Sequence, residues 1–260
     1  MLTGYPMATG FGLTTHFYNL KNHLVPEGAA SICTIHDYMG MKLTGRKAPC
    51  LSVSDGASIG CFHLEKMEYD REALKNAGIE PEILPECVAD CSLLGETAEG
   101  IPVSTGIGDN QASVLGSVKE LEGSVLVNVG TASQISTGLT RYVKAEKTEL
   151  RAISRDQYIL VGAGLCGGRA YAALERFFRR TAELMTGKDP GKLYGAMDRI
   201  LKERGMKGTT LKVDTRFCGT RREPERRGGI ANLGLENFTP EDFIMGILDG
   251  MAEELHTFYR

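Results

Sequence analysis

The residues best suited to chemistry lie in the segment 106–113 (GIGDNQAS), where two glycines precede Asp109. Glycines let the backbone turn sharply and leave a carboxylate exposed where a strand passes into a helix. Asp109 could accept a proton from a substrate hydroxyl there, and the adjacent amide of Asn110 could hydrogen-bond a polyol. The same aspartate could instead only cap the helix. The residues alone leave both interpretations open.

Two further glycine-containing segments could bind an anion. In residues 128–133 (NVGTAS), a hairpin turn at Gly130 and Thr131 would expose backbone N–H groups and a hydroxyl, which suit a phosphate. Gly167 and Gly168 precede an amphipathic segment, where a helix N-terminus attracts negative charge. A tight turn without a ligand and a merely flexible loop are the alternatives. The P-loop pattern is absent, so neither segment is decisive.

The other reactive side chains give no pattern typical of a site. The seven cysteines include no C-x-x-C spacing, and no histidine lies near Cys87 and Cys91 to complete a zinc site. We therefore expect free thiols in a reducing cytoplasm, and no metal ligands are assigned. The five histidines show no ligand spacing and are predicted to be structural. Glutamates interrupt the arginines of residues 217–229, which predicts pairing on a surface loop.

Helices and strands must position these segments. Apolar spacing predicts a helix within 28–43 that ends at Gly45, and Asp70 can cap a short helix, followed by an extended linker at 81–85. Beyond residue 102, strands and helices alternate, which indicates an α/β fold. The predicted strands are 103–108, 124–129, 132–137 and 158–163. The predicted helices are 109–117, the segment after Gly168 up to Gly187, 192–205, and a last helix capped by Thr239 with Asp242.

Bulk properties exclude several classes of function. The net charge of −3 offers no reason to expect nucleic acid as a partner. No apolar run reaches the roughly 18 residues that a membrane-spanning helix needs. We therefore expect a cytoplasmic globular protein without nucleic acid or membrane partners. The change of pattern predicts a boundary near residue 102, with one domain over 1–102 and another over 103–260.

The order of these segments resembles the FGGY family of carbohydrate kinases, and the likeness extends over nearly the whole chain. Segments similar to the latter part of the family's first domain and to its second domain follow one another. Residues 9–16 and 237–240 are most similar to the family members that phosphorylate sedoheptulose. The segments that carry the resemblance are 37–45, 83–85, 108–112, 128–131, 167–168 and the Thr-Arg-x-x-Pro-x-x-Arg-Gly stretch at 220–228.

The resemblance implies an actin-like (ribonuclease H-like) fold and transfer of the γ-phosphoryl group of ATP to a sugar, a ketose such as sedoheptulose, with Mg²⁺. It implies that Asp109 is the catalytic base and that Asn110 contacts the sugar. It further implies that Gly130, Thr131 and Gly168 bind the nucleotide phosphates. The expected partners are therefore a small sugar and ATP, and a homo-oligomer is compatible with the sequence.

The family's opening Asp-x-Gly-Thr strand pair and its glycine-rich adenosine motif find no counterpart in these 260 residues. We therefore expect a partial first domain and most of the second, truncated at both ends. We also expect residues 1–260 to be unable to phosphorylate a sugar alone. The alternatives are a non-catalytic remnant that acts as a binding or oligomerisation module, and an unrelated α/β protein.

Overall fold

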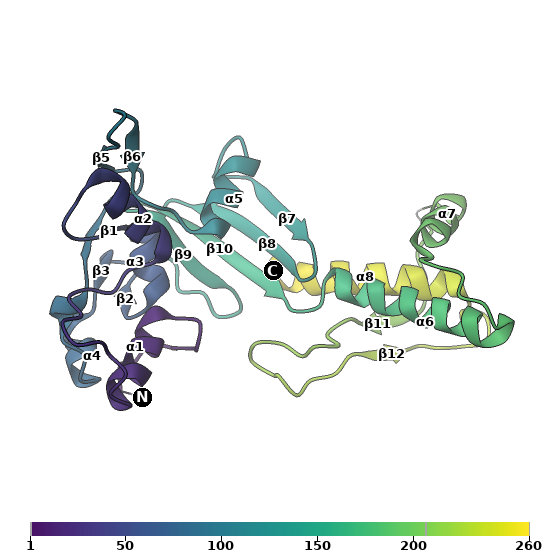
Figure 1. Cartoon of the computed structure of the whole chain (residues 1–260). Coiled ribbons are helices and arrows are strands. Elements are labelled where there is room, and N and C mark those ends of the chain that lie inside the picture. The colour runs from purple at the N-terminus through teal and green to yellow at the C-terminus, as the bar shows by residue number, and fades with distance from the viewer. Residues whose placement is uncertain (1, 206, 260) are drawn as a thin grey trace. The chain divides into compact units, whose positions relative to one another are not determined.

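The computed structural model describes residues 2–205 and 207–259, and it confirms the mixed α/β architecture (Figure 1). The chain forms two compact units. The first unit comprises Met1–Ser124, Thr137–Ala145 and Glu149–Leu160, and the second comprises Val125–Ser136, Glu146–Thr148 and Val161–Arg260. The boundary predicted near residue 102 separates the two domains of the family that the chain resembles, not these compact units. It therefore stays a prediction.

The first unit contains short helices and strands in alternation. They are α1 (Gly12–Lys21), α2 (Ile35–Thr44), β1 (Cys50–Ser52), α3 (Val53–Ile59), β2 (Phe62–His63), β3 (Glu68–Tyr69), α4 (Arg71–Asn76), the 3₁₀ helix η1 (Pro81–Ile83), β4 (Glu86–Val88), β5 (Leu93–Glu96), β6 (Pro102–Ser104), α5 (Asp109–Ser117) and β9 (Glu149–Ser154). Strand β1 pairs with β4 in parallel, whereas β2 with β3 and β5 with β6 are antiparallel pairs. Leu13, Leu51, Val53 and Leu74 are fully buried in its apolar core.

Side-chain caps fix where α2 and α3 begin. The hydroxyl of Thr34 accepts a hydrogen bond from the backbone N–H of Asp37, and Ser52 does the same for Asp55. Each pair satisfies a helix N–H group that lacks a partner within its helix. At the other end of α2, Gly45 takes the left-handed conformation with φ of 69°, as the sequence predicts.

The sequence-based prediction was wrong at three places in this unit. The strand expected over 103–108 is β6, which ends at Ser104, because the glycines at 106 and 108 belong to the irregular segment before α5. The helix expected within 28–43 begins only at Ile35, because the N–H of Ile32 donates to the carbonyl of Ile83 at 3.0 Å instead of continuing a helix. The segment at 81–85, expected to be extended, contains η1 and leads into β4. The latter two segments pack against the core, and this tertiary packing overrides their local propensity.

The second unit is built around long helices. Its elements are β7 (Val125–Val129), most of β8 (Ser133–Leu139), the later part of β10 (Gln157–Gly164), α6 (Gly168–Thr186), α7 (Tyr194–Arg204), β11 (Lys212–Asp214), β12 (Gly229–Ala231) and α8 (Pro240–Tyr259). The spatial order of strands in the four-stranded sheet is β7, β8, β10 and β9.

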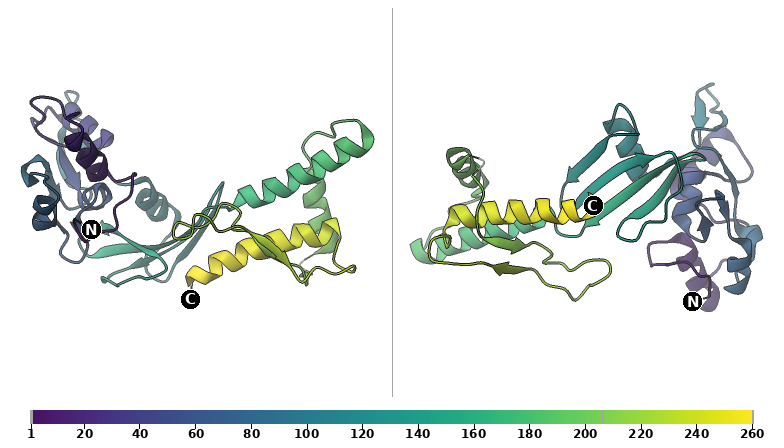
Figure 2. Two further views of the ribbon diagram at one scale, coloured as in Figure 1. Left: turned by 90° about the horizontal axis from the view of Figure 1, so that it is seen from below. Right: turned by 180° about the vertical axis from the view of Figure 1, so that it is seen from behind.

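Helices α6 and α8 lie side by side, as Figures 1 and 2 show, and bury an apolar core that includes Leu174, Leu211 and Ile244. Gly187 ends α6 with φ of 70°, and Asp242 donates its backbone N–H to the hydroxyl of Thr239 at 3.2 Å. Both helix limits confirm the sequence-based prediction. Within the described residues, we find no helix long and apolar enough to cross a membrane.

Candidate functional site

A cavity of about 990 Å³ lies within the first unit. Its wall is formed by side chains from α2, α3, the start of α5 and strand β9, together with the segments around Tyr5 and Phe62. The polar residues that line it include His36, Asp55, Asp109, Glu149 and Arg151. The cavity is therefore large enough for a small polar molecule and offers both charged and neutral hydrogen-bonding groups.

Asp109 is the first residue of α5 and lines this cavity. Gly108 occupies the N-cap position, so Asp109 is not itself the N-cap residue. Its side chain is exposed, and Oδ1 accepts a hydrogen bond from the N–H of Asn110 at 2.6 Å. The carboxylate thus combines access to the cavity with one bond that limits its rotation, as a proton acceptor requires.

Asn110 is oriented by a residue that is distant in sequence. Nη1 of Arg151 donates to Oδ1 of Asn110 at 3.1 Å, and Nη2 of Arg151 pairs with Oε2 of Glu149 at 2.7 Å. A guanidinium only donates hydrogen bonds, so it must face the amide oxygen of Asn110. The amide nitrogen of Asn110 is therefore turned away from Arg151 and can donate to another group.

Two glycines allow the segment before α5 to approach its neighbours closely. A Cβ atom at Gly106 would lie 2.1 Å from Cδ2 of His36, and one at Gly108 would lie 2.6 Å from Oε1 of Gln111. Gln111 is buried, and its Nε2 donates to the carbonyl oxygen of Ala152 on β9 at 3.1 Å. The glycines of the 106–113 segment thus bring α5 against both α2 and β9.

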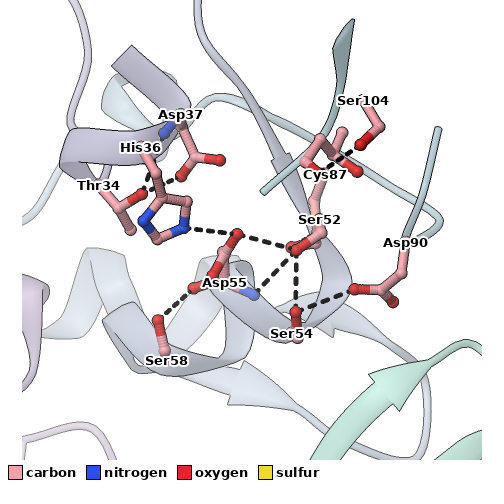
Figure 3. Close-up of polar contacts among 11 residues, drawn as sticks. Thr34, His36, Asp37, Ser52, Ser54, Asp55, Ser58, Cys87, Asp90 and Ser104 are labelled. Atoms are coloured by element: carbon pink, nitrogen blue, oxygen red, sulfur yellow. Dashed lines mark hydrogen bonds and ion pairs between the residues drawn. The ribbon is translucent and has the colours of Figure 1, made fainter. Parts of the chain in front are cut away.

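A polar network lies next to this segment at the first turns of α2 and α3 (Figure 3). Nε2 of His36 is 3.0 Å from Oδ2 of Asp55, which also accepts from the Ser52 hydroxyl at 3.0 Å. Asp37 is buried, and this burial raises the pKa of its carboxyl group, while the hydrogen bond from Thr34 opposes the rise. The sequence analysis missed this network because its members come from two separate segments.

The second unit brings the three predicted phosphate-binding residues together. Gly130 and Thr131 lie in the turn between β7 and β8, and Gly168 begins α6. The N–H of Gly168 donates to the carbonyl of Gly130 at 2.8 Å, and the N–H of Arg169 donates to that of Thr131 at 3.3 Å. The start of α6 therefore supports the turn.

These bonds determine which groups are available to an anion. The N–H groups of Gly168 and Arg169 already donate to the turn, so a phosphate role for Gly168 stays a prediction and would have to act through the turn that it holds. The hydroxyl of Thr131 lies in the turn itself. Asp109 belongs to the first unit and Thr131 to the second. That the two face each other across a cleft therefore stays a prediction.

Solved sugar kinases share this fold. A xylulose kinase from Rhodospirillum rubrum aligns with 94% of this chain and 50% of its own, with a TM-score of 0.79 and 21% identity. A glycerol kinase from Plasmodium falciparum, solved with ADP, aligns with 97% of this chain and 52% of its own, with a TM-score of 0.77 and 18% identity. The chain thus has the actin-like fold of these kinases over the part that aligns, as expected.

Sequence comparison also points to sugar kinases. Residues 2–116 match the N-terminal domain of the FGGY family of carbohydrate kinases, which confirms the resemblance seen in the motifs. Human sedoheptulokinase is 25% identical over 96% of this chain and 55% of its own length. The chain therefore spans about half the length of the curated relatives that it matches along most of its sequence.

Proposed function

We propose that this chain forms part of an ATP-dependent sugar kinase, with the sugar bound in the cavity of the first unit. The observation that carries the proposal is that Asp109 and Arg151 line that cavity, with Arg151 fixing the amide of the adjacent Asn110. The match of residues 2–116 to a carbohydrate kinase domain supports it. The domain division at residue 102 is part of the same proposal.

In this mechanism, Asp109 acts as general base. Its carboxylate accepts the proton of a sugar hydroxyl while the hydroxyl oxygen attacks the γ-phosphorus, and the bond from that phosphorus to the β,γ-bridging oxygen breaks to release ADP. Asn110 would donate its amide N–H to the sugar and so align the attacking oxygen. Alignment is the chief requirement because phosphoryl transfer leaves the protein little covalent chemistry to perform.

The turn at Gly130 and Thr131 fits a nucleotide phosphate. Two backbone hydrogen bonds from the start of α6 hold it, so the backbone that carries the Thr131 hydroxyl is fixed where this hydroxyl could contact a phosphate oxygen. When bound with ATP, Mg²⁺ neutralises the phosphate charge. We assign none of the residues described above to this ion.

The proposed substrate is a ketose such as sedoheptulose, in line with the human relative. A test would express the longest polypeptide that carries this sequence and measure ADP release with ATP, Mg²⁺ and a panel of sedoheptulose, xylulose, ribulose and glycerol. We expect saturable ADP release with one ketose. Saturable sugar binding without any ADP release would contradict catalysis and favour a binding module, and absence of both would overturn the proposal.

A further inference from the structure

Three side chains able to bind a metal ion converge beside the cavity, and two of them, His36 and Asp55, line it. His36, Asp37 and Asp55 each offer one ligand atom, and these atoms all lie within 4.8 Å of one another. His36 and Asp37 are in the first turn of α2, whereas Asp55 is in the first turn of α3 (Figure 3). An imidazole nitrogen with two carboxylate oxygens is a donor set that Zn²⁺ and Mn²⁺ accept.

Helix capping explains only part of this arrangement. Oδ2 of Asp37 accepts from the Thr34 hydroxyl, and Oδ2 of Asp55 accepts from Ser52. Oδ1 of Asp37, however, has no hydrogen-bond partner among residues 2–205 and 207–259, and the residue as a whole is only 1% exposed. A buried carboxylate oxygen without a partner is costly, so this atom indicates a missing positive ligand.

The charges in the cluster point the same way. Asp37 and Asp55 are each 1% exposed, and His36 is the basic side chain that the structure pairs with Asp55. Two buried carboxylates therefore share at most one positive charge within the cluster. A divalent cation would neutralise both carboxylates and bind the imidazole in its neutral form.

The distances suit ligands of one ion. Two ligands about 2.1 Å from a tetrahedral Zn²⁺ lie about 3.4 Å apart, and Nε2 of His36 is 3.0 Å from Oδ2 of Asp55. The His36 side chain is 43% exposed, so its ring has room to turn as Asp37 completes the set. Because His36 and Asp55 line the cavity, a remaining coordination position would face it.

We propose that His36, Asp37 and Asp55 bind one divalent transition-metal ion at the cavity wall, with water or a polyol hydroxyl completing its coordination. The site uses none of the residues of the turn at Gly130 and Thr131. It is also independent of the proposed kinase activity, because metal binding can be measured without turnover.

The test is calorimetric titration of the chain with ZnCl₂ in a non-chelating buffer. Cys91 and Cys218 are exposed thiols that could bind Zn²⁺, so both are replaced by serine in every protein compared. We expect one ion per chain, with affinity falling about 100-fold or more in His36→Ala, since even a lost outer-sphere partner costs about 10–100-fold. Mn²⁺ is titrated in parallel because it binds thiolates poorly.

Matched controls separate a site from general charge. His63→Ala removes another histidine that lines the cavity, and Asp90→Asn removes a neighbouring half-buried carboxylate that accepts from Ser54. Both should leave the affinity unchanged, whereas His36→Ala and Asp55→Asn should lose it. Circular dichroism checks that each variant is folded. If a variant does not fold, His36→Gln is titrated in its place. Failure of both ions to bind stoichiometrically, or equal affinity in His36→Ala, would overturn the proposal.

Discussion

At the scale of single residues, the proposed mechanism gives Asp109 and Asn110 different tasks within one helical turn. The carboxylate of Asp109 is exposed to the cavity, whereas the amide of Asn110 is held by Arg151. Local sequence could propose both residues, because the glycines that precede them indicate a turn. It could not reveal Arg151, which lies 41 residues after Asn110 and reaches it only through the packing of β9 near α5.

Replacing Asp109 by asparagine tests the proposed base. In an active polypeptide that carries this sequence, we expect Asp109→Asn to lower kcat by about 10²–10⁴-fold, because asparagine keeps the shape but cannot accept the proton. Sugar affinity should change far less. Steady-state kinetics at saturating ATP and calorimetric sugar binding measure the two effects. Near wild-type turnover would show that Asp109 has only a structural role at the start of α5.

Arg151 should act on sugar binding through Asn110. We expect Arg151→Ala to raise KM about tenfold with a smaller change in kcat, because one charge-assisted hydrogen bond that orients the amide is lost. Arg155→Ala, a nearby arginine outside the cavity lining, serves as the control. An unchanged KM in Arg151→Ala would mean that Asn110 keeps its orientation without the guanidinium.

At the scale of elements, the start of α6 and the turn between β7 and β8 form one structure. A Cβ atom at Gly168 would lie 2.6 Å from the carbonyl oxygen of Gly130, whereas one at Gly130 would meet no atom within 4 Å. Strand and helix periodicity predicted both elements, since each is long and regular. It could not show that backbone hydrogen bonds join them, because that contact depends on the tertiary fold.

The two glycines should therefore differ when replaced by alanine. We expect Gly168→Ala to lower the free energy of unfolding by about 1–3 kcal/mol, because the methyl group forces the backbone of the turn to move. Gly130→Ala should stay within about 0.5 kcal/mol of the wild type. Urea denaturation followed by circular dichroism compares them. Equal stability of the two variants would show that the turn can separate from α6 without loss.

Strand β11 ends in a carboxylate whose charge should make stability depend on pH. Asp214 accepts hydrogen bonds from Arg216 at 2.6 and 2.7 Å and from Arg226 at 3.1 Å, and these arginines lower its pKa to about 2. A pKa depressed in the folded state stabilises the protein above the ordinary aspartate range near 3.8. This stabilisation is lost as the pH falls toward 2.

Asp214→Asn should therefore destabilise the protein at pH 7 by about 1–2 kcal/mol, a figure reduced from the full linkage value because the carboxylate is about a quarter exposed. The difference from the wild type should shrink as the pH is lowered from 4 toward 2. Chemical denaturation at a series of pH values gives both quantities. A difference that stays constant with pH would exclude the ion pairs as its cause.

At the scale of the whole molecule, the residues that the structure describes form two apolar cores with no residue in common. One is built from residues of the first unit, such as Leu74, and the other from residues of the second unit, such as Ile244. The alternation of strands and helices predicted the α/β class. The sequence pattern changes near residue 102, whereas the two compact units exchange segments over residues 125–160. This exchange depends on long-range contacts, so the sequence pattern alone could not reveal it.

Separate cores predict that unfolding occurs in two steps. Leu74 and Ile244 are both fully buried, so replacing either by alanine should cost about 2–5 kcal/mol. Because each side chain contacts only its own core, Leu74→Ala should lower one calorimetric transition temperature and Ile244→Ala the other. Substitution of both residues should lower the two transitions together, with effects that add because the two side chains belong to different cores. A single transition lowered equally by either substitution would show that the two cores unfold as one cooperative unit.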